Sequence, residues 1–263
     1  MSTVTSQDGT TIAYDRRGSG PALVIVPGVL ATRALGSVPA LAGLLANDFT
    51  VVAYDRRGKG DSGDTRPYAV DREIEDLEAL IDAAGGEAFV YGHSSGGALA
   101  LLAAAKLGGR VARLALYEVP YTADPRGEAA WKEYVSRLAA LLADGRNGDA
   151  VALFLQLTGL SADQVAGMRQ APFWPAMEAG APTLAYDHIG ILGPTAAIPA
   201  DLAAAVTVPT LVMSGGASLP FMRATAERLS GILPHARLRI VEGQAHNVSP
   251  EVLAPILAGF FRG

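Results

Sequence analysis

A serine between two glycines is the residue best placed to do chemistry in this chain. Ser94 lies at the centre of Gly92-His93-Ser94-Ser95-Gly96, between a short apolar run and the Ala/Leu-rich segment Ala98 to Leu107. This order is typical of a strand, a sharp turn and a helix that present a nucleophilic serine. The glycines on either side leave room for the turn, because a Cβ there would collide with the strand or the helix. Ser95 is disfavoured as the nucleophile, because the residue two positions before it is a histidine.

A serine hydroxyl is a poor nucleophile at neutral pH, so a base must lie within hydrogen-bond reach. The chain offers four histidines: His93, His188, His235 and His246. His246 follows the last predicted strand, at the edge where parallel sheets place their binding sites, and we predict that it is the base. We expect His93 to be structural and His235 to lie on the surface. His188 falls in the middle of the chain and is a candidate for a substrate contact.

The histidine in turn needs an acid to orient it, and two positions compete for that role. Ser218 follows the predicted strand Thr210 to Ser214 where an aspartate would be expected, but a serine cannot stabilise an imidazolium ion by charge. Glu118 ends the predicted strand Val111 to Tyr117, and a carboxylate there is costly unless it has a partner. We predict that Glu118 is the acid, with an ion pair to an arginine as the alternative and Glu242 as the fallback.

Hydrolysis of an ester also needs donors for the negative charge that develops on the carbonyl oxygen. Two backbone N–H groups suffice, and we predict that they come from Ser95 and from Val29, which lies just after the apolar run Ala22 to Val26. The nearby Arg56 and Arg57 are expected to pair with carboxylates and to brace the loop that carries Val29.

Composition narrows the class of protein. The chain has 263 residues, of which 50% are hydrophobic and 18% charged, with a net charge of -5 and a pI of about 5.4. The acidic balance argues against nucleic acid, and no apolar run is long enough to span a membrane. There is no cysteine for disulfides or thiolate chemistry, and no metal or cofactor motif. The polar start of the chain lacks a signal segment, so we expect a soluble, cytoplasmic protein.

The elements that must position these residues alternate between strands and helices. Buried runs such as Ala22 to Val26 and Thr50 to Tyr54 are interleaved with helical segments such as Arg72 to Ala84, which predicts an α/β fold with a mostly parallel, doubly wound sheet. The alternation stops in the middle of the chain. We therefore predict a core domain made of residues 1–118 and 207–263, and an inserted helical cap made of residues 119–206.

The chain resembles the α/β-hydrolase superfamily, and specifically its members with a helical cap. The resemblance extends over most of the sequence and rests on Val26-Pro27-Gly28-Val29, Tyr54-Asp55-Arg56-Arg57-Gly58-Lys59-Gly60-Asp61-Ser62, Gly92-His93-Ser94-Ser95-Gly96, Val208-Pro209-Thr210-Leu211-Val212 and Glu242-Gly243-Gln244-Ala245-His246. Ser94, Glu118 and His246 are similar to the triad of zearalenone-type lactone hydrolases, in which Glu-Val-Pro likewise follows this strand. The chain departs from the family at Pro27-Gly28, where His-Gly is common.

The cap is expected to select the substrate. It holds most of the large aromatic side chains, which suits an apolar, cyclic or acyclic acyl group, although many of them will simply form the core of the cap. The candidate substrate-binding residues are Trp131, Tyr134, Phe154, Phe173, Trp174, Met177, Tyr186 and His188.

The sequence therefore predicts a serine hydrolase that cleaves an apolar carboxylic ester or lactone through an acyl-enzyme, without a metal or cofactor. Two other interpretations stay open: an enzyme of the same fold that cyclises, isomerises or eliminates, and a ligand-binding pseudo-enzyme. Epoxide and haloalkane hydrolysis are disfavoured, because those relatives carry a carboxylate at the position of Ser94. The chain could also form a homodimer.

Overall fold

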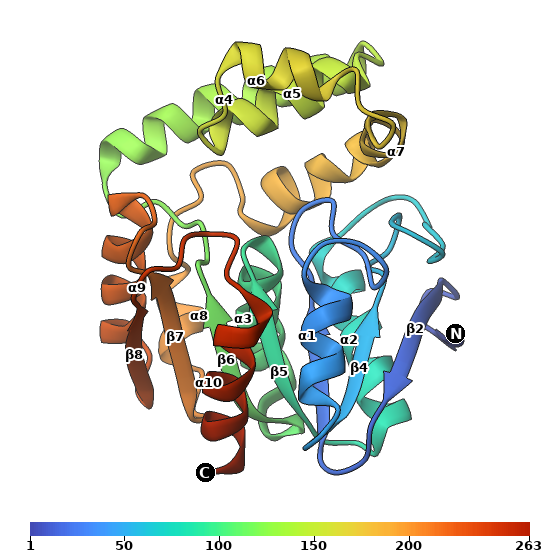
Figure 1. The fold of residues 1–263 in the computed structure, drawn as a ribbon, viewed down its shortest axis with the longest axis vertical. Helices are drawn as coiled ribbons and strands as arrows, with labels where there is room; N and C mark the ends of the chain where they lie inside the picture. Colours follow the sequence, from blue (N-terminus) through green and yellow to red (C-terminus); the bar gives the residue numbers. More distant parts are fainter.

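The computed structural model describes all of residues 1–263, and one eight-stranded sheet runs through it (Figure 1). The strand order is β1-β2-β4-β3-β5-β6-β7-β8, with β1 and β2 antiparallel to their neighbours and the remaining pairs parallel. The strands are β1 (Ser2–Thr5), β2 (Thr11–Arg17), β3 (Ala22–Val26), β4 (Thr50–Tyr54), β5 (Ala88–His93), β6 (Val111–Tyr117), β7 (Thr210–Gly215) and β8 (Ala236–Val241). The α/β fold predicted from the sequence is confirmed.

Helices cover both faces of this sheet. The α-helices are α1 (Val38–Leu45), α2 (Val70–Ala84), α3 (Ser95–Leu107), α4 (Pro125–Ala143), α5 (Asn147–Leu157), α6 (Ala162–Met168), α7 (Trp174–Gly180), α8 (Ala200–Ala204), α9 (Pro220–Ile232) and α10 (Pro250–Arg262). Short 3-10 turns η1 (Gly108–Arg110) and η2 (Ala181–Thr183) and the π-helix η3 (Tyr186–Ile191) complete the list. None of these helices combines the length and the apolar composition that crossing a bilayer requires.

The hydrophobic core lies on the two faces of the sheet. On one face α1 packs against α10, and both cover apolar side chains such as Ile25, Val51 and Tyr91. On the other face α2, α3 and α9 lie on the alternate side chains of the sheet, for example Val24 and Val90. The central strands β3 and β4 are buried along their whole length, as their continuous apolar runs predict.

The segment between β6 and β7 forms a helical layer beyond one end of the sheet. Figure 1 shows α4 to α7 lying across the top of the view, above the strands. This layer is joined to the sheet domain through two short helices that contact each other: η2 packs against α5 of the layer, and η3 packs against α3 of the sheet domain. The short helix α8 contacts α3 and α9 of the sheet domain instead. The boundaries of a separate cap at residues 119 and 206 remain a prediction.

The long helix α2 and the strand β7 lie where the sequence places them, with differences of one to two residues at their ends. Strands β1 and β2 form an N-terminal hairpin. Helix α1 was not predicted. Its buried residues Val38, Leu41, Ala42 and Leu45 nevertheless recur at helical spacing, and Pro39 lies in its first turn.

Candidate active site

Ser94 lies in the turn between β5 and α3. Its backbone has φ 56° and ψ -128°, in a region that non-glycine residues rarely adopt and that costs on the order of 1–3 kcal/mol. The Ser94 residue is only 9% exposed. This strained conformation holds the side chain at the tip of the turn, as the spacing of the glycines predicts.

The two glycines around Ser94 permit this turn because other backbone atoms approach them closely. A Cβ on Gly92 would lie 2.6 Å from the Gly96 carbonyl oxygen, and a Cβ on Gly96 would collide with the carbonyl oxygens of Val26 and Pro27. The start of α3 is thereby packed directly on the end of β3. Any larger residue at position 96 would push these two segments apart.

Glu118 and His246 form a hydrogen-bonded pair. His246 Nδ1 lies 2.9 Å from Glu118 Oε2, so two residues 128 positions apart in sequence meet beyond the ends of β6 and β8. Glu118 Oε1 accepts hydrogen bonds from the Gly215 N–H at 2.8 Å and from the Ser214 hydroxyl at 3.1 Å. Burial raises the pKa of Glu118, but hydrogen bonds, chiefly from His246, outweigh that effect and lower the pKa below its usual value.

The other two candidates for the acid do not take this position. Glu242 is exposed and is not hydrogen-bonded to His246. The Ser218 hydroxyl is buried without a well-formed hydrogen bond, although it is close enough to help lower the pKa of Glu118. Glu118 itself has a φ of 49°, so the chain turns sharply at the point where the carboxylate leaves β6.

Two contacts hold the histidine loop against the ends of β5 and β6. The ring of His93, the residue before Ser94, places Nε2 3.0 Å from the backbone carbonyl oxygen of His246, and the two rings are 4.9 Å apart. The Tyr117 hydroxyl donates to the Ala245 carbonyl oxygen at 2.7 Å. Burial and the nearby His246 lower the pKa of His93 to about 4, so His93 is neutral at physiological pH. His93 is therefore structural, as predicted.

The Ser94 hydroxyl and His246 are not hydrogen-bonded to each other in this structure. Hydrogen bonds between a nucleophile and its base are often long or poorly aligned before substrate binds, and they tighten in the complex. The His246 side chain is 36% exposed, whereas its partner Glu118 is fully buried. The imidazole is thus anchored at one nitrogen and open to a ligand at the other.

The two segments that carry the predicted oxyanion donors both adjoin Ser94. Ser95 is the first residue of α3, where backbone N–H groups have no partner within the helix and the helix dipole is positive. The loop that carries Val29 touches the turn, because a Cβ on Gly28 would be 3.1 Å from the Ser94 Cβ. The next residue, Leu30, has φ 54°, so the loop bends away immediately after Val29.

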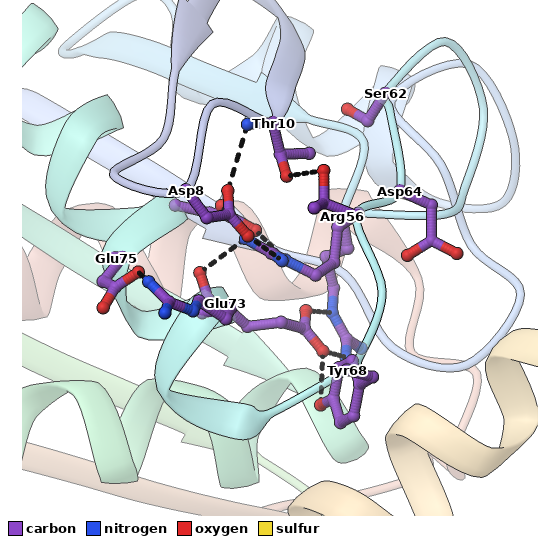
Figure 2. A network of polar contacts seen from close by, with 12 residues as sticks. Asp8, Thr10, Arg56, Ser62, Asp64, Tyr68, Glu73 and Glu75 are labelled. Carbon is purple, nitrogen blue, oxygen red and sulfur yellow. Dashed lines mark hydrogen bonds and ion pairs between the residues drawn. The ribbon is translucent and has the colours of Figure 1, made fainter.

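Four buried charges lie beneath the start of α3. Arg56 makes two hydrogen bonds to Glu73, at 2.7 and 2.8 Å, and Figure 2 shows Tyr68 donating to the same carboxylate. Arg56 and Lys59 also pair with Asp187 of η3. Burial raises the pKa of Asp187, but these two cations lower it far below its usual range, so Asp187 is ionised.

A further contact of this charge cluster reaches the residue next to Ser94. The Ser95 hydroxyl donates to Asp187 Oδ1 at 2.6 Å, and both side chains are completely buried. Asp187 is not among the residues predicted from the sequence. No local pattern signals it, because the loop that carries the three cations, at positions 56, 57 and 59, has carboxylates of its own at positions 55, 61 and 64.

The other arginine of the loop braces a different part of the fold. Arg57 binds Asp76 through two hydrogen bonds, at 2.7 and 2.8 Å, and Asp8 of the N-terminal hairpin at 2.9 Å. Both arginines thus pair with carboxylates, as predicted. Only Arg56 reaches the loop of Val29, through a long contact of 3.4 Å from Nη1 to the Pro27 carbonyl oxygen.

The structure brings four of the predicted substrate residues together as an aromatic cluster in the helical layer. The rings of Trp131, Tyr134 and Phe154 lie 5.4–5.5 Å from the His188 ring, and the Tyr134 hydroxyl is 2.9 Å from His188 Nδ1. His188 is 3% exposed, and burial lowers its pKa to about 4. Its neighbour Asp187 contacts Ser95, so this cluster lies close to the serine turn.

The remaining four candidates do not join that cluster's ring contacts. Tyr186 stacks on Tyr68 at 3.9 Å and donates to Asp64. Trp174 is buried under the guanidinium of an arginine, Phe173 is 50% exposed, and Met177 packs at the margin of the main core. No group of three or more His, Asp or Glu side chains is arranged to hold a metal ion.

Comparisons with known proteins agree with this architecture. A family model described as the alpha/beta hydrolase fold matches residues 21–251. An alpha/beta hydrolase from Sphaerobacter thermophilus DSM 20745 is 53% identical, with a TM-score of 0.87 over 99% of this chain and 100% of that one. No match was found among curated protein sequences.

Two more distant structures carry more specific names. The enol-lactonase from Burkholderia xenovorans LB400 is 22% identical over 100% of both chains, with a TM-score of 0.74. A thermophilic esterase from Thermogutta terrifontis is 19% identical over 99% of this chain and 97% of that one, also with a TM-score of 0.74. At these identities the likeness shows the fold alone. The family model and the Sphaerobacter structure together establish that this chain belongs to the alpha/beta hydrolase family.

Proposed function

We propose that this protein is a serine hydrolase that cleaves an apolar carboxylic ester or lactone, with Ser94, His246 and Glu118 as its catalytic triad. The observation that carries the proposal is the pair formed by His246 Nδ1 and the buried Glu118 carboxylate at 2.9 Å, on a loop that His93 holds against the serine turn. A base that is oriented by a buried carboxylate beside a strained serine is the arrangement that acyl transfer requires.

In the acylation step Ser94 Oγ attacks the carbonyl carbon and transfers its proton to His246 Nε2. The ionised Glu118, whose pKa is lowered, holds the Nδ1–H and stabilises the imidazolium by charge. The N–H groups of Val29 and Ser95 receive the oxyanion. When the tetrahedral intermediate collapses, the C–O bond to the alcohol breaks, and the alkoxide leaves with the proton from His246.

Deacylation uses the same residues with water as the nucleophile. His246 removes a proton from water, the new C–O bond forms, and Ser94 leaves with that proton as the carboxylic acid is released. For a lactone the alcohol and the acid are two ends of one product. Every proton that His246 accepts is returned within the same half-reaction, so the enzyme is unchanged after each turnover.

The helical layer is proposed to act as a cap that selects the substrate. The aromatic cluster of Trp131, Tyr134, Phe154 and His188 adjoins the serine turn through the Asp187–Ser95 contact. Its rings offer an apolar surface, while the His188–Tyr134 pair offers a hydrogen-bonding group. This combination suits an apolar acyl or ring-containing group that carries a polar substituent.

The nucleophile is tested by labelling with a fluorophosphonate probe, followed by mass spectrometry of the labelled peptide. The label is expected on Ser94 in the native protein and to be absent from Ser94→Ala, with ester turnover reduced on the order of 10³-fold or more. Ser218→Ala, which removes another buried serine of the same site, should retain labelling. A label that persists on Ser94→Ala would remove this serine from the mechanism.

The substrate class is tested by comparing short esters with medium and large lactones as substrates of the native protein. Release of acid from either set, abolished in Ser94→Ala, supports hydrolysis and ranks the two classes. Labelling of Ser94 without hydrolysis of any member would favour cyclisation, isomerisation or elimination on the same residues. A protein that neither labels nor hydrolyses would favour the ligand-binding interpretation.

A further inference from the structure

We propose that Asp187, on the π-helix η3 of the helical layer, is a positioning residue for the oxyanion hole. The inference rests on the proposed function, because it assigns a role to Asp187 only through Ser95 and Val29. The hydrogen-bond partners of Asp187 are Arg56, Lys59 and Ser95, and Ser94 is not among them. Asp187 lies beneath the start of α3 and is in contact with both of the segments that supply oxyanion donors, one directly and one through Arg56.

The direct connection is through the side chain of Ser95. The Ser95 hydroxyl donates to Asp187 Oδ1 at 2.6 Å, a charge-assisted hydrogen bond between two fully buried groups. The backbone N–H of the same residue is one of the two proposed oxyanion donors. Fixing the Ser95 side chain therefore fixes the first residue of α3, and with it the direction of that N–H.

The indirect connection is through Arg56. Its guanidinium pairs with Asp187 and Glu73 at once, which leaves Nη1 3.4 Å from the Pro27 carbonyl oxygen. Pro27 begins the short loop that carries Val29, the second proposed donor. The same buried carboxylate thus holds one donor segment by a hydrogen bond and orients the arginine that lies against the other.

The arrangement of charges explains why an ionised acid is needed at position 187. Arg56 and Lys59 are two buried cations, and Glu73 and Asp187 are the two carboxylates that neutralise them. Asp187 receives three donors: Arg56 and Ser95 at Oδ1, and Lys59 at Oδ2 at 2.7 Å. An amide at this position would keep the shape, but it would present an N–H₂ group to at least one donor.

Catalysis by an oxyanion hole is sensitive to such a change. Loss of one donor typically costs about 10²- to 10³-fold in kcat, and a displacement of about 1 Å can cost on the order of 10²-fold. Because the N–H of Ser95 would be displaced and not removed, we expect Asp187→Asn to lower kcat by about tenfold to a hundredfold. KM should change little, because the oxyanion forms only after substrate has bound.

The experiment compares an activated ester with the matching thionoester, in which sulfur replaces the carbonyl oxygen. Sulfur is larger and accepts hydrogen bonds poorly, so a well-formed oxyanion hole favours the ester strongly. The ratio of kcat/KM for ester over thionoester is expected to fall by about fivefold or more in Asp187→Asn. Rates are normalised to the fraction of enzyme titrated by the fluorophosphonate, so partial unfolding does not alter the ratio.

Two further variants keep the test decisive. Asp76→Asn is the matched control. Asp76 is as buried as Asp187 and pairs with Arg57, the neighbour of Arg56, but it contacts neither donor segment. Asp76→Asn should lower stability and leave the ester-to-thionoester ratio unchanged. Ser95→Ala keeps the backbone N–H and removes the hydroxyl. It should lower the ratio as Asp187→Asn does, and the double variant should lower it by less than the product of the two single effects.

Each outcome decides the question. An unchanged ratio in both Asp187→Asn and Ser95→Ala, with the native enzyme active, would overturn the positioning role and leave the proposed function intact. An equal fall of the ester-to-thionoester ratio in Asp76→Asn would also overturn the positioning role, because any damage to the charged loop would then have this effect. Should Asp187→Asn fail to fold, Ser95→Ala alone carries the comparison. If the native protein hydrolyses no ester and Ser94 is not labelled, the proposed function fails and this inference fails with it.

Discussion

The most informative single change is Glu118→Gln, because it keeps the shape of the side chain and removes its charge. In the native site Glu118 Oε2 faces His246 Nδ1 at 2.9 Å, and Oε1 accepts from the Gly215 N–H at 2.8 Å. The Gly215 N–H requires an acceptor, so the amide oxygen of glutamine will take that side. The amide N–H₂ group then faces His246 Nδ1 and favours the tautomer with its proton on Nε2.

That tautomer cannot accept the proton of Ser94, and the charge that would stabilise the imidazolium is also lost. The corresponding change in the serine-protease triad, which is the worked example of this mechanism, lowers kcat about 10⁴-fold. A loss of 10⁴-fold corresponds to about 5 kcal/mol of transition-state stabilisation. We expect Glu118→Gln to fall near this value. Ser218→Ala should cost about tenfold at most, because only a neutral, poorly formed contact is removed.

The assay is kcat/KM on an activated ester at pH 7, per active site titrated by a fluorophosphonate, with circular dichroism to verify the fold. The reasoning is refuted if Glu118→Gln stays within about tenfold of the native enzyme. It is also refuted if Ser218→Ala is as damaging as Glu118→Gln, since the charge of Glu118 would then matter no more to catalysis than the hydroxyl of Ser218.

Three other changes test separate parts of the structure. His188→Gln should flatten the pH dependence of stability. Folding lowers the pKa of His188 from 6.5 to about 4, so the unfolded chain binds more protons than the folded chain between these two pH values. The free energy of unfolding of the native protein therefore falls by about 3 kcal/mol as the pH drops through this window. Gly96→Ala should lower the free energy of unfolding by about 2 kcal/mol or more, because its Cβ meets two backbone carbonyl groups. Glu118→Ala combined with Ser218→Asp should recover part of the activity lost in Glu118→Ala, by supplying a carboxylate from the neighbouring loop.

The measurements and controls for these changes are specific. The His188 prediction is measured by urea unfolding of His188→Gln and of the native protein at pH 7 and at pH 4.5. Equal losses of unfolding free energy in the two proteins between these pH values would contradict it. Gly109→Ala is the control for the second, because a Cβ there has no neighbour within 4 Å and should leave the unfolding midpoint nearly unchanged. Ester turnover tests the third, and a double variant no more active than Glu118→Ala would show that residue 218 cannot reach His246 productively.

The parts of the site that follow strands were predictable from the sequence. Ser94 is identified by glycine spacing, and His246 and Glu118 by their positions after buried strands, because parallel strands bring their carboxyl ends to one edge. The strands themselves are recognisable because burial on both faces demands continuous apolar runs. The meeting of His246 with Glu118 follows from this topology, since β6, β7 and β8 are neighbours.

The parts that depend on the helical layer were not predictable. Asp187 reaches Arg56 across 131 positions of sequence, and that contact depends on how several short helices pack, for which no periodic pattern exists. The eight candidate substrate-binding residues could not be sorted for the same reason. Three of them converge around a fourth, His188, while Tyr186 stacks on Tyr68, and only the tertiary structure separates these groups.

The position of Asp187 also limits how freely this protein can exchange its helical segment with relatives, whether by recombination in nature or by grafting in the laboratory. A donor segment without an acid at this place would leave Arg56 and Lys59 in the interior with Glu73 as their only counter-charge. An unmatched buried cation costs on the order of 3–5 kcal/mol, a large part of the stability of a typical domain. Successful chimaeras should therefore retain Asp187, or replace Lys59 at the same time.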